Sequence, residues 1–251
     1  FAFFLGFNLA AQLLALAAVV ITGGLSFWRN RALGPAQGLS RKELNALWLL
    51  IPLFLLGCGL FYTHTLEPAA NGSLHVGQST FGDLSMHLSI ASSIGEQGMF
   101  PPDYSIFRGY PIGYPFLCDS VSSTFYVLGS SLRFSMLLPA VTDYALVIFG
   151  GWNFFFDWLK TENRAALAFL LFFIGGGFGF AYFFDLLKSE PGKFAEIFTG
   201  FYRTPTNLPD NGLRWVNPIA DMLIPQRATL FGWAVLFPCL FLLRRAVFEE
   251  K

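Results

Sequence analysis

The chain has 251 residues, of which 54% are hydrophobic, 18% aromatic and only 13% charged. Soluble domains carry about 25% charged residues, so this composition excludes an ordinary soluble domain and predicts an integral membrane protein. The 16 basic and 16 acidic side chains balance, which gives no reason to expect a nucleic acid as partner.

Five apolar runs approach or exceed the roughly 20 residues that a helix needs to cross a bilayer. In chain order they are residues 3–27, 46–64, 136–158, 165–187 and 227–245. A sixth segment, 120–133, is short and rich in serine, and it could be re-entrant, interfacial or the start of a bent span. The predicted fold is therefore all-α: a polytopic transmembrane helix bundle of five or six spans, forming a single domain over 1–251.

Basic residues set the predicted orientation, because they accumulate in cytoplasmic loops. Residues 28–45 hold four basic side chains and one acid, whereas 65–118 hold one arginine and four acids. A consistent path places 28–45, 159–164 and 244–251 in the cytoplasm and the two long loops, 65–118 and 188–226, outside. This path requires that 120–133 does not cross alone.

The two outward loops are the distinctive feature of the pattern. Loops beyond about 12–15 residues are usually functional or disordered. These two are rich in aromatic residues, proline and glycine rather than in charge, which disfavours disorder. We expect them to be ordered and to cap the bundle, with a short helix in the first.

The first loop places Asp83 four residues before His87, in "TFGDLSMHL". Residues i and i+4 share one face of a helix, so the two side chains could reach one metal ion, water or hydroxyl. An acid near a helix N-terminus tends to remain ionised and can act as a base. The structural alternative is that Thr80 and Asp83 form a capping box and that His87 bonds to a neighbouring loop.

Prolines and glycines stiffen the following stretch, "FPPDYSIFRGYPIGYPFLCDS". It presents Arg108, Tyr114 and Asp119. Arg108 is the only basic residue of its loop and suits a phosphate, or else it pairs with Asp103 or Asp119. Tyrosines here could also be interfacial anchors.

Arg227 stands at the start of the last span, after Pro225 and Gln226. It could snorkel toward lipid headgroups or bind the phosphate of a lipid-linked substrate. The run "GGGFGF", at 175–180, contains a G-x-x-x-G pair that favours close helix packing; a break in the helix is the alternative. No G-x-S-x-G, Walker A, H-E-x-x-H or C-x-x-C motif is present, and the three cysteines have no metal-binding spacing.

Taken in order, these motifs resemble polytopic membrane glycosyltransferases of the GT-C type, and more narrowly bacterial members of that class. The similarity rests on Asp83-x-x-x-His87, "FPP", "GYPIGYPF", the glycine run with Asp185, and Pro225-Gln226-Arg227. It covers roughly residues 80 to 232. Full enzymes of this type have more spans, so the resemblance implies an amino-terminal portion or a reduced, inactive relative.

The resemblance also implies a mechanism and a location. A sugar on a polyprenyl phosphate would pass to an outward-facing acceptor, with Asp83 as general base and sometimes a divalent cation. Arg108 or Arg227 would hold the phosphate, and His87 would orient Asp83 or touch the acceptor. We therefore expect catalytic roles for Asp83 and His87, which would also be the ligands of any metal ion, and substrate contacts at Arg108, Tyr114, Asp119 and Arg227. The implied location is the bacterial cytoplasmic membrane, and the implied partners are membrane lipid and a lipid-linked sugar.

Two other hypotheses compete with a transferase. A non-catalytic structural subunit of a larger membrane complex would pack its phenylalanine-rich surface against other membrane subunits. A transporter would use ionisable side chains inside its spans, and here the carboxylates within the predicted spans are Asp143, Asp157 and Asp185.

Overall fold

The computed structural model describes the chain except for residues 32–39, 78–79, 81, 176, 200–206 and 249–251. Within the described residues, four helices are long and apolar enough to cross a membrane: α2 (Leu9–Asn30), α3 (Arg41–His64), α6 (Leu132–Leu159) and α10 (Arg227–Phe248). A bent pair, α7 (Glu162–Ile174) and α8 (Gly179–Ser189), raises the number to as many as five. The predicted helical membrane fold is confirmed.

Capping residues explain where three spans begin. Ser40 and Glu43 form a reciprocal capping box at the start of α3, with the Glu43 carboxylate accepting from the Ser40 amide at 2.7 Å. Asn8 caps α2 and Ser131 caps α6 by accepting from backbone amides three residues later. These caps move the spans a few residues away from the limits of the apolar runs, because the first turn of a helix tolerates polar residues.

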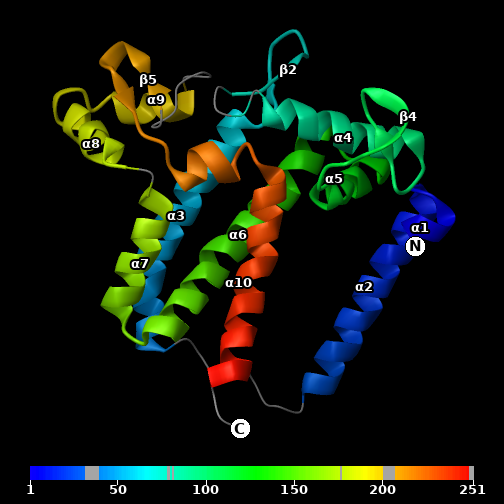
Figure 1. Cartoon of the computed structure of the whole chain (residues 1–251), viewed down its shortest axis with the longest axis horizontal. Helices are drawn as coiled ribbons and strands as arrows, with labels where there is room; N and C mark the ends of the chain where they lie inside the picture. Colours follow the sequence, from blue (N-terminus) through cyan, green and yellow to red (C-terminus); the bar gives the residue numbers. More distant parts are fainter. Residues whose placement is uncertain (32–39, 78–79, 81, 176, 200–206, 249–251) are drawn as a thin grey trace.

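The bundle core lies where α6 packs against α3, α7 and α10 (Figure 1). Its largest fully buried side chains are aromatic, including Phe61, Tyr144, Phe169 and Phe173. By contrast, α2 is held by the short helix α1 (Ala2–Leu5) and by the end of α5 (Leu117–Val127), and most of its length is exposed.

The predicted span 165–187 is not one straight helix. Helices α7 and α8 meet at 85°, and Gly177 adopts a positive φ of 106° at the bend. The 13 residues of α7 rise only about 20 Å, short of the ~30 Å hydrocarbon layer. Of the two interpretations of the glycine run, the structure therefore shows the break in the helix. Gly179 does serve close packing, but against the backbone of Arg214 and Trp215 rather than against another helix.

The first long segment between spans forms a layer across one end of the bundle (Figure 1). It contains a hairpin of β1 (Glu67–Pro68) and β2 (Leu74–His75), helix α4 (Asp83–Gln97), a hairpin of β3 (Asp103–Tyr104) and β4 (Phe107–Pro111), and helix α5. The 11 residues of α5 are too few to cross a bilayer, and the helix packs on α4 and α6. The segment 120–133 therefore does not cross alone.

The second long segment lies at the same end of the bundle (Figure 1). It is built from α8, α9 (Lys193–Thr199), β5 (Asn207–Leu208), the short 3-10 helix η3 (Pro209–Asn211), β6 (Leu213–Arg214) and the π-helical turn η4 (Pro218–Leu223). The turn between α6 and α7 lies at the opposite end. Both long loops thus share one side of the bundle, as the predicted path requires; which side faces outward stays a prediction.

Candidate functional site

Helix α4 carries the predicted Asp83–His87 pair. It begins at Asp83 and ends at Gly98, whose left-handed conformation (φ 65°) closes the last turn. The capping-box alternative for Thr80 does not form, because the N-cap residue is Gly82 and no side chain caps the helix. The Thr80 hydroxyl lies 2.7 Å from the Gly77 carbonyl and 3.1 Å from that of His64. Asp83 is therefore in the first turn of the helix without serving as part of a capping box.

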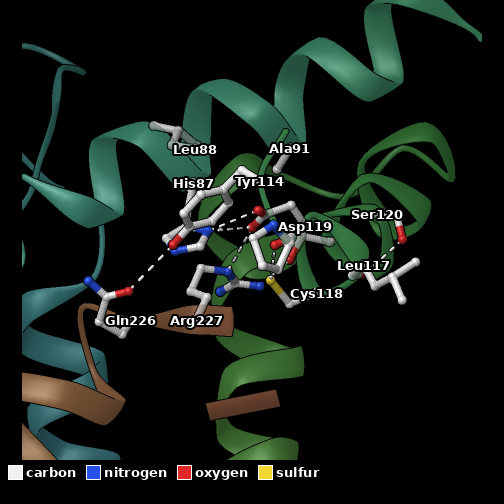
Figure 2. Close-up of polar contacts among 12 residues, drawn as sticks. His87, Leu88, Ala91, Tyr114, Leu117, Cys118, Asp119, Ser120, Gln226 and Arg227 are labelled. Carbon is white, nitrogen blue, oxygen red and sulfur yellow. Dashed lines mark hydrogen bonds and ion pairs between the residues drawn. The ribbon is translucent and has the colours of Figure 1, made fainter. Parts of the chain in front are cut away.

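His87 points from α4 to Asp119 in the first turn of α5 (Figure 2). Its Nδ1 lies 2.9 Å from Asp119 Oδ2 and 3.1 Å from Oδ1. Since a carboxylate can only accept, Nδ1 is the donor in this contact. Nε2 is buried and has no hydrogen-bond partner among the described residues. The imidazole is thus fixed by one nitrogen and unsatisfied at the other.

Arg227, at the start of α10, completes the cluster (Figure 2). Its Nε donates to Asp119 Oδ1 at 3.3 Å, its Nη1 to the Met136 carbonyl at 2.9 Å, and its Nη2 to the Ser122 hydroxyl. His87 and Asp119 are fully buried and Arg227 is 4% exposed. An unpaired buried charge is costly, and here the two buried charges of Asp119 and Arg227 pair with each other. Their hydrogen bonds connect α4, α5, α6 and α10 at one end of the bundle.

Cys118 adds a thiol to the same cluster. The ligand atoms of His87, Cys118 and Asp119 lie within 4.8 Å of one another. Burial, followed by the charge of Asp119, raises the pKa of the Cys118 thiol to about 12. A metal ion needs the thiolate and would meet a carboxylate that Arg227 already neutralises. These residues therefore fit a buried ion pair better than a cation site.

Tyr114 links this buried cluster to Asp83. Its ring lies edge-on to the His87 ring at 5.5 Å, and its hydroxyl donates to Gln226 Oε1 at 3.5 Å (Figure 2). Burial raises the pKa of Tyr114, and the negative charge of Asp83 raises it further. Asp83 itself is half-buried, and within the described part of the chain its carboxylate has no hydrogen-bond or ion-pair partner. Asp83 is therefore an accessible acid, whereas His87 and Asp119 are fully buried.

Arg108 lies elsewhere. It is exposed on β4, in a hairpin fastened to α4 by Ser89–Ser105 (2.8 Å) and by Gln97, whose side chain bonds the backbone of Asp103. These attachments are about 9 and 21 Å along the helix from Asp83, at 1.5 Å per residue. The Asp103 carboxylate accepts from the Gly109 amide and Asp119 is used by Arg227, so neither predicted salt bridge forms.

The structure brings together His87, Tyr114, Asp119 and Arg227. Asp83 stands one turn before His87 on α4, and Arg108 lies apart on β4. Asp119 accepts from His87 Nδ1, which leaves His87 Nε2 as the ring nitrogen open to a ligand; a metal ion shared by Asp83 and His87 stays a prediction. Sequence reasoning missed Cys118, Ser122 and Gln226. Two of these adjoin a predicted site residue in sequence, but the 32-residue separation of His87 and Asp119 carries no periodic signal.

Comparisons with protein-family models, with curated proteins and with solved structures found no match.

Proposed function

We propose that this chain is a GT-C-type membrane glycosyltransferase-like protein that transfers a sugar from a polyprenyl-phosphate donor to an acceptor. In this proposal it lies in a bacterial cytoplasmic membrane, with the α4–α5 layer facing outward. One observation carries the proposal. The half-buried Asp83, in the first turn of α4, has no hydrogen-bond or ion-pair partner among the described residues, whereas Asp119 on the adjoining helix α5 is buried and paired.

The proposed reaction uses Asp83 as general base. Its carboxylate takes the proton of an acceptor hydroxyl, the acceptor oxygen forms a bond to the anomeric carbon, and the bond from that carbon to the phosphate oxygen breaks. The polyprenyl phosphate leaves with the electron pair. Asp83 stands in the first turn of α4, where the helix dipole favours a negative charge. The Asp119–Arg227 ion pair, through the hydrogen bond of Asp119 to His87, fixes the helix that carries this base.

The choice of the arginine that binds the phosphate depends on which arginine is already hydrogen-bonded within the protein. Arg227 donates to Asp119, Met136 and Ser122, which leaves little capacity for a ligand. Arg108 is exposed and belongs to no ion pair within the described residues, and a guanidinium can stabilise a developing phosphate charge. Arg108 is therefore the better candidate. Because the phosphate is bonded directly to the anomeric carbon, the proposal requires Arg108 and Asp83 to face the same bound donor.

The test is Asp83→Asn, which removes the base and keeps the shape. We expect release of polyprenyl phosphate from a lipid-linked sugar to fall about 100-fold or more, the usual scale for a general base. Glu96→Gln is the matched control, because this exposed acid lies on the same helix and bonds Tyr126. Circular dichroism checks that both variants fold. Equal activity in the Asp83 variant and the parent chain would refute the role of Asp83.

The structural-subunit hypothesis also keeps one supporting observation. Helix α2 buries only Ala11 and Gln12, and large apolar side chains along the rest of it are exposed. Lipid alone could cover this face, or another membrane subunit could. Crosslinking from a cysteine at Leu16 in native membranes separates the two: a discrete protein adduct supports a subunit, whereas lipid-only labelling by a photoreactive probe opposes it.

A further inference from the structure

An apolar cavity of about 160 Å³ lies between the spans and the second outer segment. Its walls come from α3, the end of α7, helices α8 and α9, and the stretch around Trp215. These elements meet at the upper left of the bundle in Figure 1. The cavity shares no lining residue with the cluster around Asp83, so it calls for a separate explanation.

Nearly all of the wall is hydrocarbon. The two polar side chains in the lining are Trp215 and Asn217, and both are engaged within the protein. Trp215 Nε1 donates to the Ile174 carbonyl at 3.3 Å, and Asn217 Oδ1 accepts from the Ala220 amide at 3.0 Å. A sugar, phosphate or peptide would lose its hydration here with little in return. The chemistry of the wall selects an apolar ligand.

The volume of the cavity limits which apolar ligands can enter it. A helix is about 10–12 Å across with its side chains, so a partner helix cannot enter 160 Å³. Apolar cavities of about 150 Å³ remain dry and take up small hydrocarbons. A segment of one flexible hydrocarbon chain therefore matches the available volume.

The cavity also opens toward the lipid. Leu53 and Leu56, on the span α3, are only half-buried, and the rim residues Phe184 and Phe194 are 54% and 47% exposed. In a bilayer the surroundings of α3 at this depth are the acyl chains of phospholipids. We propose that this cavity binds an acyl-chain segment of a membrane phospholipid, which enters sideways between α3 and the α8–α9 layer.

The experiment uses Trp215 as a reporter inside the cavity. The other five tryptophans are replaced by Phe, and the chain is placed in bilayers whose phospholipids carry brominated acyl chains. Although Trp215 is only 9% exposed, we expect its fluorescence to be quenched at least twofold. Trp152 kept as the sole tryptophan is the burial-matched control. It is 7% exposed within the aromatic core, so its fluorescence should change little.

A plug variant tests the position of the chain. Leu56→Phe fills the mouth and should remove at least half of the Trp215 quenching. Leu55→Phe makes the same change at an exposed neighbour outside the lining and should have no such effect. The proposal is overturned if Trp215 is quenched no more strongly than Trp152. It is also overturned if Leu56→Phe leaves the quenching of Trp215 unaltered.

A second measurement needs no tryptophan replacement. Phospholipid with a diazirine on its acyl chain is photolysed with the otherwise unaltered chain, and labelled peptides are identified by mass spectrometry. We expect label on the buried lining residues Phe173 and Phe183, lost in Leu56→Phe and kept in Leu55→Phe. Label confined to exposed faces such as α2 contradicts the proposal. Neither result depends on glycosyl transfer.

Discussion

Asp119 is the residue on which the packing of the α4–α5 layer depends most. It accepts from His87 on one side and from Arg227 on the other, with no exposure to solvent. A buried ion pair contributes little relative to a well-packed apolar replacement, but removal of one partner leaves a buried charge unpaired. A substitution of one partner should therefore destabilise the protein far more than the simultaneous replacement of both partners by apolar residues.

We predict that Asp119→Ala lowers the free energy of unfolding by about 3–5 kcal/mol, the typical cost of breaking a buried pair. The double variant Asp119→Leu, Arg227→Leu should recover at least half of this loss. Denaturant unfolding in detergent measures both. Asp185→Ala, which breaks an exposed pair with Lys188, is the control and should change stability by less than about 1 kcal/mol. Additive losses in the double variant would contradict the ion-pair interpretation.

Tyr114 reports the charge on Asp83. The pKa of Tyr114 is raised above its ordinary value of 10.0, first by burial and then by Asp83. We predict that Asp83→Asn lowers the pKa of Tyr114 without restoring it to 10.0. Phenolate absorbance, taken as the difference from Tyr114→Phe, measures this titration. An unshifted or higher pKa in the Asp83 variant would show that the two groups do not interact.

The sign of the accompanying stability change also follows. Because the folded state favours the neutral phenol, the contribution of Tyr114 to stability is fully present below pH 10 and is lost as the pH rises through its raised folded pKa. The Tyr114→Phe variant should lack this part of the alkaline destabilisation.

At the scale of elements, glycine decides how closely two spans approach. The G-x-x-x-G pair at Gly175 and Gly179 indicated close helix packing, but the helix breaks there. The close approach of α3 to α6 depends instead on Gly57. A Cβ at Gly57 would lie 2.3 Å from the Tyr144 ring, which is fully buried and donates its hydroxyl hydrogen to the Leu53 carbonyl at 3.0 Å.

We predict that Gly57→Ala destabilises the bundle by about 1–3 kcal/mol, the usual cost of overpacking, with Tyr144 forced from its site. Gly24→Ala on α2 is the matched control, since a Cβ there meets nothing within 4 Å, and it should be neutral or slightly stabilising. Thermal unfolding in detergent compares the two. Equal midpoints for Gly57→Ala and the parent chain would contradict the packing argument.

At the scale of the whole molecule, the layer of α4 and α5 determines the topology. Because α5 lies across the end of the bundle, both long segments remain on one side (Figure 1). The distribution of basic residues predicts that this side faces outward. If α5 crossed the membrane instead, the second long segment would face the opposite side from the first.

We predict that cysteines introduced at Asn71 and Asp210 react with a membrane-impermeant maleimide in intact cells, whereas one at Asn163 reacts only after lysis. All three positions are exposed, and the three native cysteines are replaced by Ala beforehand. Opposite labelling of positions 71 and 210 would show that α5 crosses. Labelling of position 163 alone would invert the predicted orientation.

The sequence by itself determined the membrane class, most span positions and helix α4, because each depends on local composition or on a helical period. The i, i+4 spacing also placed Asp83 and His87 on one helix. The packed helices were needed to show that His87 turns to Asp119 rather than to Asp83 and that Arg227 is used by the same carboxylate. Both outcomes depend on contacts between residues 32 and 108 positions apart, whose geometry exists only once the helices have packed.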